Sequence, residues 1–533
     1  MPDVVGCLPM DASLPSSGTE GRDRAVGLAG ESRRLWQEGR FDEAVRRLES
    51  AAACDPLNPE ICLGLGKALA TRARYAEARE WMHKACTLAP GSLPVRFQAA
   101  VYWHQVGRAD EALALLEEAL RLDPAHPGAL LLTGEIREHR HELEGAEEVL
   151  ERIRARAPGH PGGAFLEARV RRRRGDLTGA EGHVRVLVAD RRLPAELRYR
   201  AWVELGQVLD LQGRWDEAMQ AFHQGKQLLI PQAGPWWAAL QGVQREAERM
   251  LAQSETLGVG RWRESLPGLG AEQRLALLCG HPRSGTTLLE QVLESHPGVV
   301  SAEETRILHD EAYLPLTWGE DPRLGVAELL DRVDPPALRA ARERYVGGME
   351  RFLEGPLGGR LLLDKNPAFT ILLLPLARIF PEARLLFMIR DPRDVILSCF
   401  MQPLPLNPVS SAYLTLDRTV AQYRDAMSFL LALRPRLGNP WRQVHYEEFI
   451  RDPGAGAAGI LSFLGLPWDP RVLDHTGRAR GRWVKSPTYA DVTQPIHARA
   501  VGRWKRYAGH LEPHLGPIQP LLDHLGYGPD GLA

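Results

Sequence analysis

The 533-residue sequence predicts two parts of different fold class, an α-helical repeat solenoid followed by an α/β domain with a central parallel sheet. A 34-residue spacing of prolines and alanines predicts the solenoid, and short apolar runs that lead into helical patterns predict the sheet. At roughly 100–200 residues per domain, the length also favours more than one domain. We expect a disordered tail over residues 1–24, the solenoid over 25–230, a junction over 231–270 and the α/β domain over 271–533.

The composition is that of an ordinary globular protein, with 44% apolar and 25% charged residues, which excludes collagen-like and low-complexity classes. Sixty-six basic residues against 68 acidic ones give a net charge of −2, so we expect no nucleic-acid partner. No run of 18 uncharged apolar residues occurs, which predicts no membrane span, and the first 24 residues lack the pattern of a secretion signal. The six cysteines show no C-x-x-C spacing. The absence of this spacing argues against a metal site and indicates a reducing, cytoplasmic location.

The repeat is defined by small and helix-breaking residues. Four prolines are spaced 34 residues apart, at Pro56, Pro90, Pro124 and Pro158. Alanine lies twelve residues before each proline, and two more alanines continue the series: Ala44, Ala78, Ala112, Ala146, Ala180 and Ala218. Alanine lets two helices approach closely and proline ends the second helix, so the unit is a helix–turn–helix pair. It resembles the tetratricopeptide repeat, with about six copies.

The resemblance to tetratricopeptide repeats implies a concave face that holds a peptide or protein. The alternative is an array that only forms a homodimer or supports the following domain. The run Arg171–Arg174 has two interpretations as well, a solvated helix face or a site for an acidic peptide.

The α/β domain begins with a strand, a loop and a helix in the arrangement of a phosphate-binding loop. The apolar run Leu275–Cys279 leads into Gly280-His281-Pro282-Arg283-Ser284-Gly285-Thr286-Thr287, and an apolar helix follows. The loop matches G-x-x-x-x-G-K-[ST] except that Thr286 replaces the lysine. Hydrolysis of a nucleoside triphosphate uses that lysine, so its absence disfavours a kinase or ATPase.

Residues Pro282–Leu288 read P-R-S-G-T-T-L, and here the sequence resembles the sulfotransferase family. The resemblance implies a three-layer α/β domain of the P-loop type and a sulfuryl donor, 3′-phosphoadenosine-5′-phosphosulfate, with no metal. It assigns the donor's 5′-phosphosulfate to the loop residues Arg283, Ser284, Gly285, Thr286 and Thr287.

A second anion site is expected after a second strand, at residues 384–389. Arg390 follows the end of that strand, and Ser398 comes eight residues later. In the resembled family, an arginine and a serine at these positions hold the donor's 3′-phosphate. A guanidinium with a nearby hydroxyl is a sound phosphate clamp. The alternative is an ordinary surface ion pair between Arg390 and Asp391 or Asp394.

Further segments resemble protein-tyrosine sulfotransferases, namely Ala302–Arg306, Leu363–Pro367, Tyr446–Phe449 and Thr488–Trp504. The resemblance implies catalytic roles for three residues, namely a general base, a cation on the leaving oxygen and a hydroxyl that stabilises the transition state: Glu304, Lys365 and Thr488. It implies donor binding by Tyr446 and Arg503, and acceptor binding by Arg306. Only six of the 66 basic residues are lysines, which favours a point-charge role for Lys365. Alternatively, Glu303 and Glu304 only begin a helix.

Two departures from that family leave the acceptor open. Asp310 and Gln402 stand where the family has arginines, so a preference for acidic peptides and a high donor affinity are both in question. We expect a sulfotransferase that acts on a peptide or protein tyrosine. The alternatives are a carbohydrate, lipid or small-metabolite hydroxyl as acceptor, or a non-catalytic scaffold that binds nucleotide.

Overall fold

The computed structural model describes residues 19–321, 323–367, 369–474 and 494–532. The chain divides into two compact units. The first comprises the described residues of Met1–Arg137, Glu144–Pro158 and Gly347–Pro356, and the second comprises those of Glu138–Leu143, Gly159–Val346 and Leu357–Ala533. This division differs from the predicted domains, because the later repeat helices share the second unit with the α/β domain. The predicted domain boundaries therefore stay a prediction.

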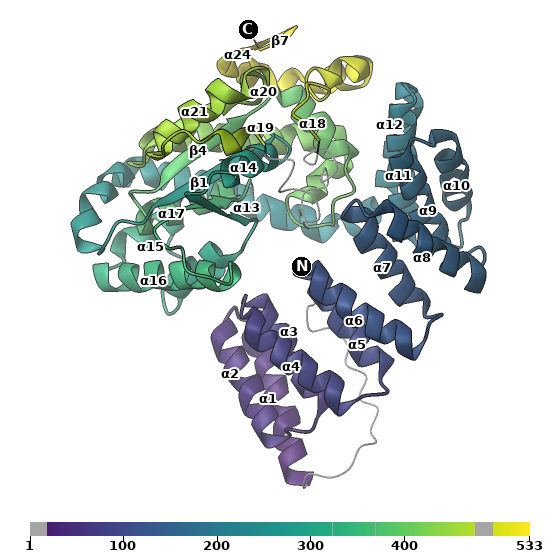
Figure 1. Cartoon of the computed structure of the whole chain (residues 1–533). Helices are drawn as coiled ribbons and strands as arrows, with labels where there is room; N and C mark the ends of the chain where they lie inside the picture. Colours follow the sequence, from purple (N-terminus) through teal and green to yellow (C-terminus); the bar gives the residue numbers. More distant parts are fainter. Residues whose placement is uncertain (1–18, 322, 368, 475–493, 533) are drawn as a thin grey trace. The chain divides into compact units, whose positions relative to one another are not determined.

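Twelve helices in the described N-terminal half form successive antiparallel pairs (Figure 1). Their bounds are α1 Thr19–Gln37, α2 Phe41–Cys54, α3 Pro59–Thr71, α4 Tyr75–Leu88, α5 Leu93–Gln105, α6 Ala109–Leu122, α7 Pro127–His139, α8 Leu143–Arg156, α9 Pro161–Arg174, α10 Leu177–Ala189, α11 Ala195–Leu211 and α12 Trp215–Gln227. All six periodic alanines, from Ala44 to Ala218, are fully buried, as close helix contact requires. The predicted repeat architecture is confirmed. One boundary differs, because residues 19–24 were assigned to the tail and are helical in α1.

The arginine run Arg171–Arg174 ends α9 and takes part in packing between helices of the second unit. Arg172 pairs with Glu204 on α11 at 2.5 Å, and Arg173 pairs with Glu138 at 3.0 Å. The Arg173 side chain is only 8% exposed. Neither a solvated face nor an open site for an acidic peptide describes these two arginines, because carboxylates of the same unit already neutralise them.

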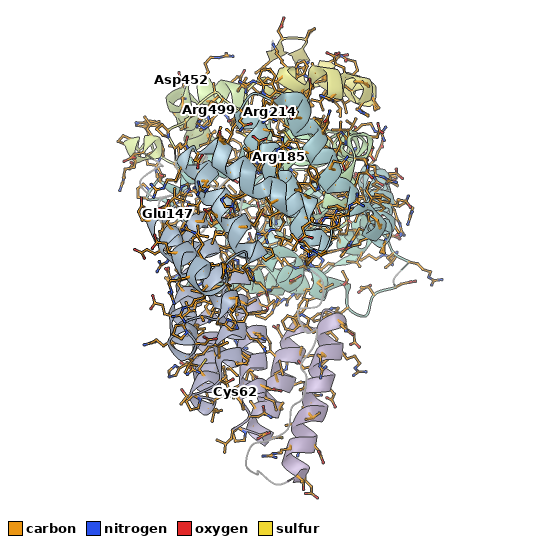
Figure 2. All side chains as sticks on the ribbon, turned by 90° about the vertical axis from the view of Figure 1, so that its right-hand side faces the viewer. Cys62, Glu147, Arg185, Arg214, Asp452 and Arg499 are labelled. Atoms are coloured by element: carbon orange, nitrogen blue, oxygen red, sulfur yellow. The ribbon has the colours of Figure 1, made fainter. Side chains whose placement is uncertain are left out.

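A second ion-pair network joins the following helices. Glu181 on α10 accepts hydrogen bonds from Arg214 at 2.9 Å, and Arg185, one turn further along α10, pairs with it at 2.7 Å (Figure 2). The side chains that form these contacts are between 16% and 51% exposed, so each ion pair stabilises the array by at most about 1 kcal/mol.

The α/β domain is built on five parallel strands in the order β2-β3-β1-β4-β5. Their bounds are β1 Leu275–Gly280, β2 Val299–Glu303, β3 Leu361–Lys365, β4 Arg384–Ile389 and β5 Trp441–His445. Both predicted strands, 275–279 and 384–389, are present. A two-stranded antiparallel ribbon, β6 Tyr527–Gly528 and β7 Gly531–Leu532, lies near the end of the chain.

Helices cover the sheet and bury both of its faces, which gives the predicted three layers. Leu278, Leu363 and Met388 face one core, to which α14 and α21 contribute, whereas Leu277 and Phe387 face the other side and are equally buried. The helix bounds are α13 Gly234–Leu257, α14 Thr286–Glu294, α15 Val326–Arg332, α16 Pro335–Phe352, α17 Leu373–Ile379, α18 Pro392–Met401, α19 Leu416–Leu433, α20 Tyr446–Arg451, α21 Pro453–Leu464, α23 Ala508–Leu511 and α24 Gln519–Leu525. Short helical turns connect several of them.

The carboxyl end of every strand carries a residue that the sequence analysis assigned to the site. In sheet order these are Glu304 after β2, Lys365 at the end of β3, the loop after β1, Arg390 after β4 and Tyr446 after β5. Ligands of open parallel sheets bind at this edge. The fold therefore brings residues from positions 280 to 446 to one edge of the sheet.

Candidate active site

The loop after β1 has the backbone geometry of an anion-binding loop. Gly285 lies in the left-handed region with φ 101°, and a Cβ there would lie 2.5 Å from Cδ2 of Tyr446. Arg283 also has a positive φ, 75°, which is unusual for a residue with a side chain. The loop runs directly into α14, whose first N–H groups have no partner within the helix. Such a helix start favours an anion.

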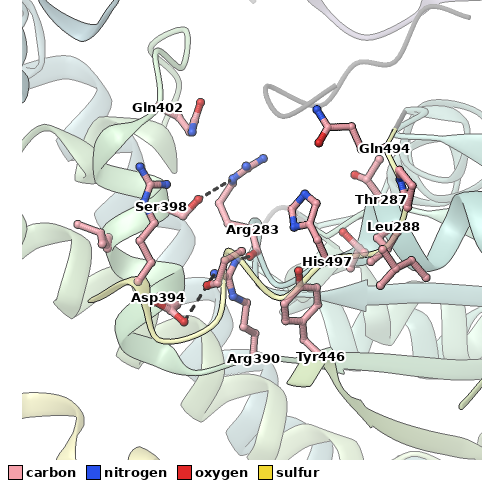
Figure 3. A pocket seen from close by; sticks show the side chains of 17 residues that line it. Arg283, Thr287, Leu288, Arg390, Asp394, Ser398, Gln402, Tyr446, Gln494 and His497 are labelled. Atoms are coloured by element: carbon pink, nitrogen blue, oxygen red, sulfur yellow. Dashed lines mark hydrogen bonds and ion pairs between the residues drawn. The ribbon is translucent and has the colours of Figure 1, made fainter. Parts of the chain in front are cut away.

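The two predicted anion sites meet in one pocket. Arg283 Nε donates to Ser398 Oγ at 3.1 Å, and Arg390 Nη1 donates to the main-chain oxygen of Arg283 at 3.1 Å (Figure 3). Gly285, Thr286, Thr287, Tyr446 and Arg503 also line this pocket. Of the nine residues predicted to bind the donor, eight therefore line a single cavity, and the ninth, Ser284, is buried in the loop beside it.

Two buried polar atoms of the loop region have no hydrogen-bond partner among the described residues, namely Ser284 Oγ and Arg390 Nε. Ser284 is 1% exposed and Arg390 is 8% exposed. A buried polar atom without a partner costs about 1–3 kcal/mol, and such atoms often mark a site that a ligand completes. Because one atom donates from the loop and the other from the end of β4, they fit a ligand with two anionic groups.

Arg390 is held from several sides, and the ion pair with Asp394 that the alternative predicted is present but buried, not at the surface. Its guanidinium lies 5.0 Å from the centre of the Tyr446 ring, and it pairs with Asp394 at 3.7 Å. Asp394 in turn accepts the backbone N–H groups of Gly502 and Trp504, each at 2.8 Å. Asp394 therefore joins the last segment of the chain to the wall of the pocket.

Lys365 lies at the centre of a carboxylate cluster and is fully buried. Its ammonium donates to Glu304 Oε1 at 2.8 Å and to Glu303 Oε1 at 3.1 Å, and Glu290 Oε2 lies 3.5 Å away. Glu290 lies on α14 and also accepts from Ser301 Oγ. The sequence analysis did not single it out. A signal was present, because Glu290 lies among apolar residues in the first turns of the helix that follows the loop.

Electrostatics of the cluster keep Lys365 charged. Burial lowers the pKa of Lys365, but Glu290, Glu303 and Glu304 together outweigh this effect and raise the pKa above its ordinary value. Burial raises the pKa of Glu290 to about 8, although Lys365 opposes the rise. The cluster therefore places a positive charge 2.8 Å from the Glu304 carboxyl group.

Glu303 and Glu304 do not begin a helix, so that alternative interpretation is wrong. Glu303 ends β2, and Glu304 follows it with φ 48°, in the left-handed region. The Glu304 N–H donates to the main-chain oxygen of Lys365 at 2.8 Å. Strained backbone of this kind costs about 1–3 kcal/mol and is concentrated at functional sites.

Arg306, the predicted acceptor-binding residue, is paired within the chain. It makes two hydrogen bonds to Asp310, both of 3.0 Å, and His309 contacts the same carboxylate at 2.6 Å. The Arg306 side chain is 62% exposed. The residue that replaces the family's second arginine thus neutralises the first, so the two do not form a cationic patch.

The remaining predictions concern Thr488, a membrane span and a metal site. Thr488 lies outside the described residues. Within the described ranges, no helix has the length and apolar character to cross a membrane, and no group of histidine, cysteine, aspartate or glutamate side chains has a metal-binding arrangement.

Asp364, next to Lys365 on β3, predicts a pH dependence of stability. It is fully buried, accepts the Tyr345 hydroxyl at 2.8 Å, and burial raises its pKa to about 7. Since the native state favours the protonated form, this group's stabilising effect is complete below pH 4 and is lost as the pH rises through 7. Urea unfolding should therefore show Asp364→Asn gaining stability relative to wild type between pH 5 and 8, on the order of 3 kcal/mol. A constant difference across that range would contradict the buried neutral carboxyl.

Comparison with known proteins agrees with both parts of this description. Residues 276–470 match the model of the sulfotransferase family. Residues 30–92, 104–170 and 165–227 match models of the tetratricopeptide repeat. The two resemblances predicted from the sequence are therefore confirmed: the N-terminal half carries tetratricopeptide repeats and the C-terminal half a domain of the sulfotransferase family.

Among curated proteins, the chain is similar to two vertebrate enzymes over about half its length. Protein-tyrosine sulfotransferase 1 of Danio rerio is 27% identical over 266 residues, which are 48% of this chain and 72% of that protein. Protein-tyrosine sulfotransferase 2 of Gallus gallus is 27% identical over 270 residues, 48% of this chain and 70% of that protein. An uncharacterized protein of Aquifex aeolicus is 25% identical over 419 residues, 77% of this chain and 52% of that protein.

Proposed function

We propose that the protein transfers a sulfuryl group from 3′-phosphoadenosine-5′-phosphosulfate to an acceptor hydroxyl. The observation that carries this proposal is the direct hydrogen bond between Arg283 of the loop and Ser398 of the second anion site. Two anion-binding groups that adjoin in one pocket suit one ligand whose ribose bears anionic groups at both its 3′ and 5′ positions. The family match of residues 276–470 supports the same reaction class.

The pocket residues have distinct roles in holding the donor. The loop from Arg283 to Thr287 and the start of α14 would bind the 5′-phosphosulfate, with Ser284 Oγ as an additional donor. Arg390 and Ser398 would bind the 3′-phosphate, and Tyr446 offers an aromatic face beside them. When bound, the donor supplies an activated sulfuryl group, and adenosine 3′,5′-bisphosphate is the leaving product.

Glu304 and Lys365 would act on the transfer itself. The Glu304 carboxylate accepts the proton of the acceptor hydroxyl as its oxygen attacks. Lys365 donates a hydrogen bond to Glu304 and supplies a fixed positive charge beside the loop, because β3 is paired with β1 in the sheet. A positioned cation stabilises the negative charge that develops on a departing oxygen. Thr488 is assigned only by resemblance.

The acceptor is proposed to be a tyrosine of a peptide or protein, on the strength of the similarity to protein-tyrosine sulfotransferases, and the repeat array would present it. One observation favours a second candidate. Arg306 is already paired with Asp310, which removes the positive charge that an acidic peptide would need. A carbohydrate, lipid or small-metabolite hydroxyl therefore stays an alternative acceptor.

Donor binding can be tested by removing the clamp on the 3′-phosphate. Arg390→Gln deletes the charge but keeps polarity, and we expect it to weaken binding of adenosine 3′,5′-bisphosphate by about 10- to 100-fold, the range for a hydrogen bond to a charged group. Isothermal titration calorimetry with the bisphosphate and with adenosine 5′-monophosphate measures this. Arg384→Gln, at the opposite end of the same strand, is the matched control and should change neither affinity.

A wild-type protein that binds neither nucleotide would overturn the donor assignment. Equal losses for both nucleotides in Arg390→Gln would instead show that Arg390 does not read the 3′-phosphate.

A further inference from the structure

The last helix pair of the repeat array contacts the wall of the anion pocket within the second compact unit. On α12, Lys226 is 2% exposed, and its ammonium donates to the main-chain oxygen of Gln402 at 2.9 Å. On α11, Asp210 pairs with Arg503 at 2.7 Å. Gln402 and Arg503 both line the pocket that contains Arg283. Two successive repeat helices thus hold residues of the predicted donor site.

Lys226 is a buried cation with an unusual environment. Its neighbours are neutral: the rings of Tyr199 and Phe400 lie 5.6 and 5.8 Å from the ammonium, and Cys399 is close enough to interact with its charge. Among the described residues no carboxylate pairs with it. Burying a charge without a countercharge is costly, so a purely structural reason for a lysine here is weak. Only six lysines occur in the chain, and this one donates to a main-chain oxygen of a residue that lines the pocket.

The position of Ser398 explains why a cation is needed. Ser398 lies in the last turn of α18, and Gln402 caps the end of that helix. The carboxyl end of a helix carries the negative end of its dipole, which opposes the binding of an anion. Lys226 donates to the terminal carbonyl at this end and offsets that field. Figure 3 shows Gln402, Ser398 and Arg283 on the same side of the pocket.

We propose that Lys226 of the repeat array is a positioning residue of the anion pocket, which makes the end of α18 compatible with a phosphate at Ser398. This inference rests on the proposed donor, and it gives the last repeat a role in donor binding besides any role in acceptor binding. Lys226 acts through Gln402 and the electric field, not by contact with the reacting atoms.

The test compares two nucleotides on the full chain. Lys226→Met keeps the length and apolar stem of the side chain and removes the charge. Titration calorimetry should show affinity for adenosine 3′,5′-bisphosphate reduced about 10-fold, as expected for a partly buried charge at a helix end. Affinity for adenosine 5′-monophosphate, which lacks the 3′-phosphate, should change less than about 3-fold. An equal loss for both nucleotides, or no loss for either, overturns the proposal.

The pH dependence of the wild type gives a second readout that does not depend on the variant's folding. Burial lowers the pKa of Lys226 to about 7, so its charge is present below that pH and is lost above it. The bisphosphate affinity of the wild type should therefore fall as the pH rises from 7 to 9, and that of Lys226→Met should not.

The other groups that face Lys226 do not titrate in this range. Burial raises the pKa of Tyr199 on α11 above its ordinary value, raises that of Cys399 on α18 to about 12, and lowers that of His223 on α12. Two further charged groups, the guanidinium groups of Arg283 and Arg390, act on Cys399. A flat wild-type profile would overturn the proposal. If the wild type did not bind the bisphosphate at all, the donor assignment would fail as well, whereas normal binding with a flat profile would refute only the role of Lys226.

Discussion

Replacing Glu304 by alanine is expected to lower the rate of sulfuryl transfer by about 10²- to 10⁴-fold, the usual contribution of a general base. The affinity for adenosine 3′,5′-bisphosphate should stay within about 3-fold of wild type, since Glu304 lies after β2 and two strands separate β2 from β4 and the 3′-phosphate clamp. A transfer assay with radiolabelled donor gives the rate, and calorimetry gives the affinity.

Glu303→Ala is the matched control for this variant. Glu303 also contacts the Lys365 ammonium, at 3.1 Å, so its loss removes a comparable ion-pair partner without removing the proposed base. We expect a loss of rate below about 10-fold, as for an ion-pair neighbour outside the proton transfer. Equal effects of the two alanine variants would mean that Glu304 only supports Lys365. A loss of nucleotide binding in Glu304→Ala would mean that its role is misassigned.

Removing Lys365 should damage both stability and turnover. Lys365→Met leaves the largely buried carboxylate of Glu303 without its cation, and breaking a buried ion pair from one side costs about 3–5 kcal/mol. We expect a lower melting temperature and no measurable transfer. Differential scanning calorimetry and the transfer assay measure the two effects separately.

The double variant Lys365→Met with Glu303→Gln separates the two roles of the lysine. Because the glutamine removes the negative charge of Glu303, which the lysine otherwise neutralises, part of the lost stability should return. The transfer activity should not return, since no cation is left beside the loop. Recovery of activity in the double variant would show that Lys365 is needed only for folding.

Much of the fold followed from spacing in the sequence. The six alanines from Ala44 to Ala218 are fully buried because a period of 34 residues places each of them where two helices touch. The strands at 275–279 and 384–389 were evident because strands buried on both faces are continuously apolar. Their connection to loops rich in anion-binding residues placed the site at the carboxyl edge of the sheet.

The details of the site depended on contacts that no spacing predicts. Glu290 joins the Lys365 cluster through the packing of α14 against the sheet, and Asp210 and Lys226 contact pocket-lining residues from repeat helices far away in the sequence. The partners of Arg172 and Arg173 were equally hidden, because Glu204 and Glu138 lie 32 and 35 residues away on other segments. Such pairings depend on tertiary packing, which local patterns do not encode.

The most direct test of the proposed function is transfer of label from ³⁵S-labelled 3′-phosphoadenosine-5′-phosphosulfate by the full chain. The acceptor panel contains tyrosine peptides with and without neighbouring acidic residues, oligosaccharides and phenolic metabolites. We predict that the label passes to at least one hydroxyl acceptor, with release of adenosine 3′,5′-bisphosphate and without added metal. Absence of transfer to every acceptor, together with phosphate release from ATP in the presence of magnesium, would contradict the account.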